Sequence, residues 1–290
     1  MNAAKDASST IASEEDIRDR SKDVTWYCKE LEDVPQQMRE LLEKYSNISP
    51  ERVSEHICSF RDKAWEIWPY PCIGGFRFLS LNLCTTAQYP EVISRLKGGE
   101  KLLDMGCFFG QESRRLVFDG APSENIYAVD SRQKFFELGY QFFLDQDRLK
   151  TNFLAADLFE SKPELEALNG TISIVYAGSI FHLFDLTKQR QLVKRTVEFL
   201  APQPGSLVLG RQVGDVNAGL YQHVTNGSGS MFRHNEQSWR KLWDDVGKDT
   251  GSKWEVCVEL KLTKRFMKRA SKDEHAHDGA RQMYFSCRRL

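Results

Sequence analysis

The stretch KLLDMGCFFGQESRR, residues 101–115, decides the fold of this chain. Its first five residues form a short apolar run typical of a buried strand, and a helix is expected to begin just after Gly110. A glycine turn between a strand and a helix usually holds a nucleotide at the carboxyl edge of a parallel sheet. Nucleotide phosphates are anions, however, and Asp104 places a carboxylate at the mouth of this turn. The ligand of this turn must therefore be compatible with the negative charge of Asp104, and the rest of the sequence indicates which ligand that is.

Strands and helices alternate after this stretch. Strands are predicted at 101–105, 126–130, 153–157, 172–178 and 206–212, and the longest later helices at 187–200 and 235–246. Such alternation predicts a parallel sheet covered on both faces. The strands predicted at 254–262 and 282–289 are joined by a polar segment that cannot form a covering crossover helix, so an antiparallel hairpin is expected. The predicted fold class is α/β: a Rossmann-like, seven-stranded, mostly parallel sheet with an antiparallel terminal hairpin.

The chain is expected to divide into three parts. Residues 1–22 are polar without periodicity and are predicted to be a disordered tail. Residues 23–90 are predicted to be an N-terminal helical cap, whose aromatic loop WPYPCIGGFRFL either packs on the sheet or walls an apolar ligand pocket. Residues 91–290 are predicted to form the cofactor-binding domain.

The net charge and the cysteine spacing argue against several classes of binding partner and site. A net charge of −1 over 290 residues gives no electrostatic reason to expect a nucleic acid or membrane partner. The seven cysteines form no C-x-x-C pair, which argues against a disulfide framework or a metal site and favours a cytoplasmic location. In the polar segment 261–281, acidic residues partly cancel the basic ones, as on a solvated face.

Three aspartates lie at the ends of the first three predicted strands, in order: Asp104, Asp130 and Asp157. A pyrophosphate would be repelled by Asp104, and only Gly106 and Gly110 remain of the dinucleotide pattern G-x-G-x-x-G. An adenosine whose ribose carries a cationic amino-acid tail fits better. Its charges suit Asp104, its ribose hydroxyls suit Asp130, and its adenine amine suits Asp157. That ligand is S-adenosylmethionine.

The chain resembles a class I S-adenosylmethionine-dependent methyltransferase, and more narrowly it is similar to fungal meroterpenoid methyltransferases. The resemblance is carried by LLDMGCFFGQESRRLVFDGAPSENIYAVD (102–130), AGSIFHLFD (177–185), PGSLVLGRQVG (204–214) and MFRHNEQSW (231–239). It implies an adenine contact at Asp157 and Leu158 and a backbone contact near Ala177 and Gly178. The expected cofactor-binding residues are Asp104, Gly106, Cys107, Gly110, Asp130, Ser131, Asp157, Leu158, Ala177 and Gly178. The class has a glycine where this chain has Phe108.

The resemblance also implies an acceptor: the carboxylate of a hydrophobic meroterpenoid or polyketide acid, such as a farnesyl-dimethylorsellinic acid. An ionised carboxylate attacks a methyl group without a base, and an arginine is its natural positioning partner. Arg211 is preferred because it follows a strand, and His182 is the candidate base if a proton must leave. The expected substrate-binding residues are Arg77, Phe78, Phe181, His182, Arg211, Arg233 and His234; His182 and Arg211 are also the catalytic candidates.

Several alternatives remain open at this point. Within the class, the acceptor could instead be a phenol, an amine or a carbon of another natural product. A nucleotide-fold dehydrogenase is a different reading, against which Asp104 argues. A non-catalytic protein with the same fold is a third, suggested by Phe108. A small hydrophobic acceptor is the expected partner, and a homodimer is left open.

Overall fold

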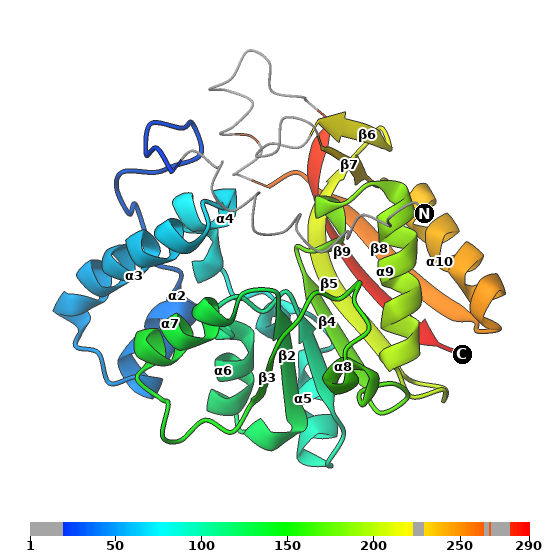
Figure 1. The fold of residues 1–290 in the computed structure, drawn as a ribbon, viewed down its shortest axis with the longest axis horizontal. Coiled ribbons are helices and arrows are strands. Elements are labelled where there is room, and N and C mark those ends of the chain that lie inside the picture. The colour runs from blue at the N-terminus through cyan, green and yellow to red at the C-terminus, as the bar shows by residue number, and fades with distance from the viewer. Residues whose placement is uncertain (1–19, 223–228, 264–266, 268–278) are drawn as a thin grey trace, which may run out of the picture.

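The computed structural model describes residues 20–222, 229–263, 267 and 279–290. Its centre is a seven-stranded sheet in the order β3-β2-β1-β4-β5-β9-β8 (Figure 1). The strands are β1 (Leu102–Met105), β2 (Ile126–Asp130), β3 (Asn152–Ala155), β4 (Ile174–Gly178), β5 (Leu207–Asp215), β8 (Trp254–Lys261) and β9 (Ala280–Arg289). The first five run parallel, whereas β9 pairs antiparallel with both β5 and β8. The predicted fold class is confirmed, including the terminal hairpin.

Helices cover both faces of the sheet, as the alternation predicts (Figure 1). One face packs on α8 (Pro163–Glu166), α9 (Leu186–Phe199) and α10 (Glu236–Thr250), through an apolar core that includes Val175, Val193 and Trp243. The other packs on α5 (Tyr89–Lys97), α6 (Gln111–Phe118) and α7 (Gln133–Phe143). Short 3₁₀ turns connect these elements: η4 (Leu83–Thr85), η5 (Ser123–Asn125) and η6 (Phe181–Leu183).

The N-terminal helices lie beside α6 and α7 rather than over the whole sheet (Figure 1). They are α2 (Gln36–Glu40), the π-helical turn η1 (Leu41–Tyr45), η2 (Pro50–Arg52), α3 (Val53–Ile67), α4 (Pro71–Gly74) and η3 (Arg77–Leu79). Their buried residues share one hydrophobic core with Phe108, Phe109, Phe135, Phe142 and Phe143. The N-terminal helices therefore pack on the turn between β1 and α6 and on α7, the helix that follows β2.

Four details of the sequence-based expectations were wrong. Strand β3 ends at Ala155, so Asp157 lies in the following loop rather than in the strand. Strand β5 continues to Asp215, which places Arg211 in the middle of the strand. The segment after β5 contains an unpredicted hairpin, β6 (Gly219–Gln222) and β7 (Ser230–Arg233). The aromatic loop contains the short helix α4.

Other expectations fall outside the structure. Most of the predicted tail and of the polar segment 261–281 lies outside the described residues. Among the residues described, no helix is both long and apolar enough to cross a membrane.

Candidate active site

The turn between β1 and α6, residues 106–110, is called the cofactor turn below, and three of its five residues have a left-handed backbone. Gly106, Phe108 and Gly110 have φ angles of 74°, 53° and 67°. A Cβ on Gly106 would lie 3.2 Å from the side chain of Ile180, and a Cβ on Gly110 would lie 2.7 Å from the ring of Phe153. The left-handed backbone disfavours a side chain at both positions, and at Gly110 the space excludes one, whereas at Gly106 the end of the Ile180 side chain would have to shift.

Phe108 adopts a left-handed backbone conformation of the kind that favours glycine. Its N–H donates to Oδ2 of Asp130 at 3.0 Å, which holds the turn against the end of β2. Its ring stacks on Phe109 with centroids 3.9 Å apart and lies 4.6 Å from Phe135 and 5.6 Å from Phe78. The side chain thus leaves the turn for the N-terminal core, where only 8% of it stays exposed.

Asp104 lies beneath this turn with 3% of its surface exposed. Its Oδ2 has no hydrogen-bond partner among the described residues. Burial raises the pKa of Asp104 well above its ordinary value, and the charges of Glu112 and Asp130 add to the effect. A carboxylate in this environment is stabilised by a nearby cation.

Glu112, at the second position of α6, is a candidate site residue that the sequence did not indicate. Its Oε1 accepts from the backbone N–H of Asn82 at 2.7 Å and from the hydroxyl of Tyr176 at 3.3 Å. Its Oε2 is buried and has no partner within the described part of the chain. Burial raises the pKa of Glu112, while the positive charge of Arg211 opposes that shift. Its spacing of four residues from buried Leu116 places it on the buried face of α6, but an acid near the start of a helix is common, so the sequence alone does not single it out.

Two buried carboxylates with unpartnered oxygens fit the amino-acid end of S-adenosylmethionine. Asp104 and Glu112 interact electrostatically with each other, and Arg211 contributes a positive charge at Glu112, so ionising both carboxylates requires a further positive charge near Asp104. A pyrophosphate would add further negative charge and does not fit. The residues present therefore agree with a cationic cofactor.

Asp130 is the last residue of β2, and its carboxylate accepts from the backbone N–H groups of Phe108 and Arg132. Arg132 stacks over the ring of Trp68 at 3.6 Å, which brings the N-terminal loop to this side of the site. Asp157 is exposed, and its Oδ1 accepts from the N–H of Phe159 at 3.0 Å. Ser131 is exposed, whereas Leu158 and Cys107 are buried.

The ends of β4 and β5 form the other side of the site. Ala177 is buried, whereas Gly178 at the end of β4 is half-buried and is in register with Arg211. Arg211 is therefore level with the end of β4 although it lies mid-strand. It is half-buried, and its Nε is buried without a hydrogen-bond partner among the described residues. His182 is half-buried in η6.

The other residues predicted to bind the substrate are held by contacts within the chain or lie in its helices and core. Arg233 lies 3.8 Å from buried Asp215. His234 is 1% exposed, its Nδ1 is 2.8 Å from the hydroxyl of Ser238, and burial lowers its pKa to about 3. Phe181 packs on Trp239, with ring centroids 5.4 Å apart. Phe78 lies in the N-terminal core, and Arg77 begins η3. An acceptor role for each of these residues stays a prediction.

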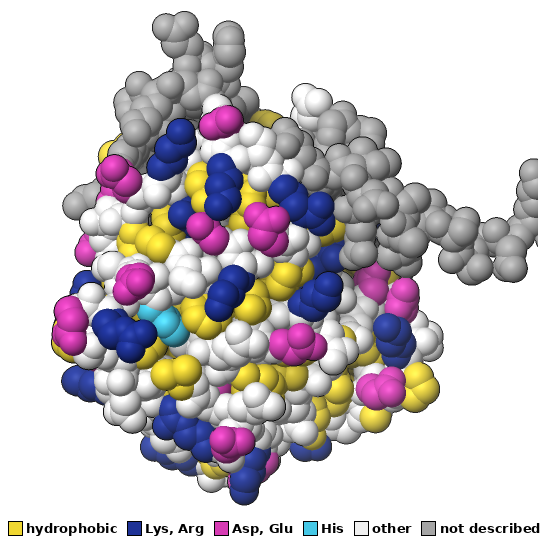
Figure 2. Space-filling model, turned by 60° about the vertical axis from the view of Figure 1, so that its left-hand side comes forward, with side chains coloured by type: hydrophobic (Ala, Val, Ile, Leu, Met, Phe, Trp, Pro, Cys, Tyr) yellow, Lys and Arg dark blue, Asp and Glu magenta, His cyan; other side chains and the backbone are white. Residues whose placement is uncertain are grey.

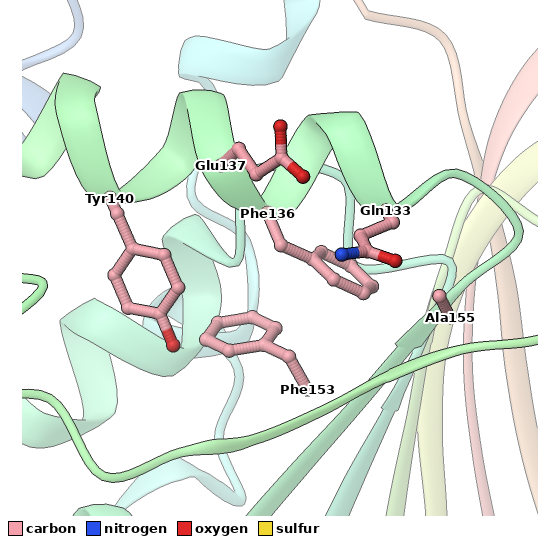
Figure 3. Close-up of a pocket in the computed structure, with 6 residues that line it drawn as sticks. All are labelled: Gln133, Phe136, Glu137, Tyr140, Phe153 and Ala155. Carbon is pink, nitrogen blue, oxygen red and sulfur yellow. The ribbon is translucent and has the colours of Figure 1, made fainter.

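A separate depression of about 360 Å³ lies between α7 and the edge strand β3 (Figure 3). Its lining residues are Gln133, Phe136, Glu137, Tyr140, Phe153 and Ala155. None of the carboxylates described above lines it, although the ring of Phe153 also lies beside Gly110 of the turn. On the face shown in Figure 2, basic and acidic side chains are interspersed, as on a solvated surface.

The strand order and the turn define a class I S-adenosylmethionine-dependent methyltransferase. Residues 26–79 match the family model "Meroterpenoid methyltransferase N-terminal domain". The fold is also that of phosphoethanolamine N-methyltransferase 2 from Haemonchus contortus, solved with S-adenosyl-L-methionine. That match has a TM-score of 0.50 and 16% identity, and it covers 87% of this chain and 59% of that chain.

Curated relatives extend the match over most of the chain. O-methyltransferase phiE from Fungal sp. (strain ATCC 74256) is 50% identical over 241 residues, covering 82% of this chain and 80% of the relative. Asnovolin E/Chermesin D methyltransferase nvfJ from Aspergillus novofumigatus is 41% identical over 229 residues, with 78% and 81% covered. The chain belongs to this family of fungal meroterpenoid methyltransferases.

Proposed function

We propose that this enzyme methylates a carboxylate oxygen of a small, hydrophobic meroterpenoid or polyketide acid. The observation that carries the proposal is Arg211, whose backbone is in register with Gly178 at the end of β4 and whose Nε is buried without a hydrogen-bond partner among the described residues. An arginine with an unused donor is suited to a carboxylate, which it binds through two parallel hydrogen bonds. The proposed setting is the cytoplasm, with neither nucleic acid nor membrane as partner, and a homodimer stays open.

The proposed cofactor contacts use the residues around the turn. Asp104 and Glu112 would face the cationic amino-acid portion of S-adenosylmethionine, Asp130 its ribose, and Asp157 with Leu158 its adenine. Gly106, Cys107, Gly110, Ser131, Ala177 and Gly178 complete the proposed set. When bound, the cofactor supplies an electrophilic methyl group on a sulfonium centre.

The chain's own contribution is positioning. Arg211 would hold the acceptor carboxylate in line with the methyl group, and the apolar core around the site would exclude water. No base is needed, because a carboxylate is already ionised at neutral pH. His234 is poorly suited to be a base, since burial lowers its pKa to about 3 and an imidazole with so low a pKa accepts a proton only weakly at neutral pH.

Mass spectrometry of reactions with S-adenosylmethionine and a panel of prenylated aromatic acids tests the proposal. The expected product gains one methyl group and loses it on saponification. A methylated product that resists saponification would reject the ester and favour a phenol, an amine or a carbon as acceptor.

Two variants separate cofactor from acceptor. Arg211→Ala is expected to leave S-adenosylhomocysteine binding within about twofold while the acceptor KM rises at least about tenfold, because one charged hydrogen-bonding partner is lost. His182→Gln is expected to keep the rate on a carboxylate. A collapse of the rate in His182→Gln would instead identify a general base and a protonated acceptor.

A further inference from the structure

A buried chain of three polar side chains connects the N-terminal helices to the cofactor turn. The hydroxyl of Tyr45, at the end of η1, donates to Oδ2 of Asp145 at 2.7 Å. Arg114 of α6 holds the same carboxylate through two hydrogen bonds, Nε to Oδ2 at 2.8 Å and Nη2 to Oδ1 at 3.0 Å. The side chains of Arg114 and Asp145 are 0% exposed.

The third nitrogen of Arg114 contacts the turn itself. Its Nη1 donates to the carbonyl oxygen of Phe109 at 2.5 Å and to that of Gly110 at 3.3 Å. It also occupies the space beside Gly110, where an added Cβ would lie 2.8 Å from it. The guanidinium therefore supports two consecutive peptide groups of the turn.

Stability alone is a weak reason for such a buried pair, because well-packed apolar residues often serve equally well. A planar guanidinium held by both carboxylate oxygens fixes direction as well as distance. We propose that Tyr45, Asp145 and Arg114 are positioning residues that make the shape of the cofactor turn depend on the N-terminal helices. This inference rests on the proposed function in one respect, namely that the turn holds the methyl donor.

The next residue of α6 supplies a matched control. Arg115 binds Asp119 through Nε at 2.7 Å and Nη2 at 2.8 Å, and Tyr89 donates to Oδ2 of Asp119 at 2.6 Å. The three side-chain types are the same as in the buried chain. The third nitrogen of Arg115, however, goes to Glu40 at 2.9 Å, and none of its described hydrogen bonds reaches the turn.

The experiment compares Tyr45→Phe with Tyr89→Phe in the full-length protein. Each change removes one hydroxyl bonded to a carboxylate and leaves the ring in place. Calorimetry with S-adenosylhomocysteine is expected to show a Kd about tenfold weaker in Tyr45→Phe, the loss of one hydrogen bond to a charged group, and within about twofold of wild type in Tyr89→Phe. Removing Asp145 is avoided, because it would leave Arg114 charged, buried and unpaired.

Hydrogen exchange without ligand provides a second measurement. The N–H of Phe108 bonds to Asp130, and that of Gly110 bonds to the carbonyl of Cys107 at 2.8 Å, so both report on the turn. Exchange at 108–111 is expected to be faster in Tyr45→Phe than in Tyr89→Phe. Equal Kd values and equal exchange in the two variants would overturn the inference. If the wild-type protein bound no S-adenosylhomocysteine, the proposed function would fail, and the exchange comparison would still decide whether Tyr45 positions the turn.

Discussion

At the scale of single residues, Phe108 shows how the turn departs from a glycine pattern without losing its shape. The residue keeps a φ of 53° and the N–H bond to Asp130 that fixes the turn. A left-handed backbone costs a residue with a Cβ about 1–2 kcal/mol. The stacking of its ring among Phe109, Phe135 and Phe78 offsets that cost.

This balance predicts an unusual order of stability. Phe108→Ala keeps the backbone strain and loses the ring, so the free energy of unfolding should fall by about 3–5 kcal/mol. Phe108→Gly also loses the ring but relieves the strain, and it should be about 1 kcal/mol more stable than Phe108→Ala. Urea unfolding of the three proteins measures both differences. An alanine variant at least as stable as the glycine variant would contradict the strain.

Asp104 leads to a prediction about pH. Its pKa is raised in the folded protein, so between the unfolded value of about 3.9 and the folded value the native state binds more protons than the unfolded state. The contribution of Asp104 to stability is therefore present at low pH and is lost as pH rises through that window. Asp104→Asn cannot ionise and should be more stable than wild type near pH 7, with the gap closing near pH 4.

Unfolding curves at both pH values, with and without S-adenosylhomocysteine, test this prediction. The ligand should raise the stability of wild type and have little effect on Asp104→Asn. A variant that is less stable than wild type at neutral pH would show that the buried carboxylate is compensated within the chain.

The sequence predicted the acids that follow strands but missed the acid inside a helix. Asp104 and Asp130 stand out because a strand of apolar residues precedes each of them. Glu112 does not, since one acidic residue near the start of a helix is common and suits the helix dipole. Its role depends on the backbone of Asn82 and on Tyr176, which are distant in sequence and adjacent only after folding.

At the scale of elements, helix α7 reaches the turn through a glycine. A Cβ on Gly139 would lie 2.5 Å from the carbonyl oxygen of Phe109, so the helix touches the backbone of the turn directly. The close approach explains a glycine in the middle of a helix, where it otherwise costs about 1 kcal/mol relative to alanine.

Gly139→Ala should therefore destabilise the protein and weaken S-adenosylhomocysteine binding, although alanine is the better helix former. A loss of about 1–3 kcal/mol in the free energy of unfolding is expected from overpacking. Gly219→Ala is the control, because an added Cβ there meets nothing within 4 Å. Unchanged or improved stability in Gly139→Ala would show that α7 can move away without cost.

The pattern of apolar residues predicted correctly those helices and strands that bury one continuous face or are buried throughout. The five parallel strands, α9 and α10 follow from apolar runs and spacing. The β6–β7 hairpin was missed because its strands have alternating or partial burial and only four residues each. The extension of β5 to Asp215 depends on pairing with β9, which lies some seventy residues later in the chain.

At the scale of the whole molecule, the N-terminal helices and the sheet domain share one core. Residues from η1 and α3 pack in the same cluster as Phe108 and Phe142. The proposed division at residue 90 therefore separates parts of the sequence rather than independently folded bodies.

Thermal unfolding should accordingly show one transition in which both parts lose structure together. Differential scanning calorimetry should give equal calorimetric and van't Hoff enthalpies, as for a two-state protein. S-adenosylhomocysteine should shift the whole transition upward rather than split it. Two separable transitions, with only the later one responding to ligand, would contradict a shared core.

The ring of Phe108 also limits how related proteins can vary in sequence. An aromatic side chain at position 108 needs a buried apolar site, and Phe78 of the N-terminal segment helps to form it. Loss of that segment would then uncover the ring and disturb the turn in a single event. We therefore expect relatives with an aromatic residue at position 108 to keep the N-terminal segment. We also expect the residues at positions 78 and 108 to vary together.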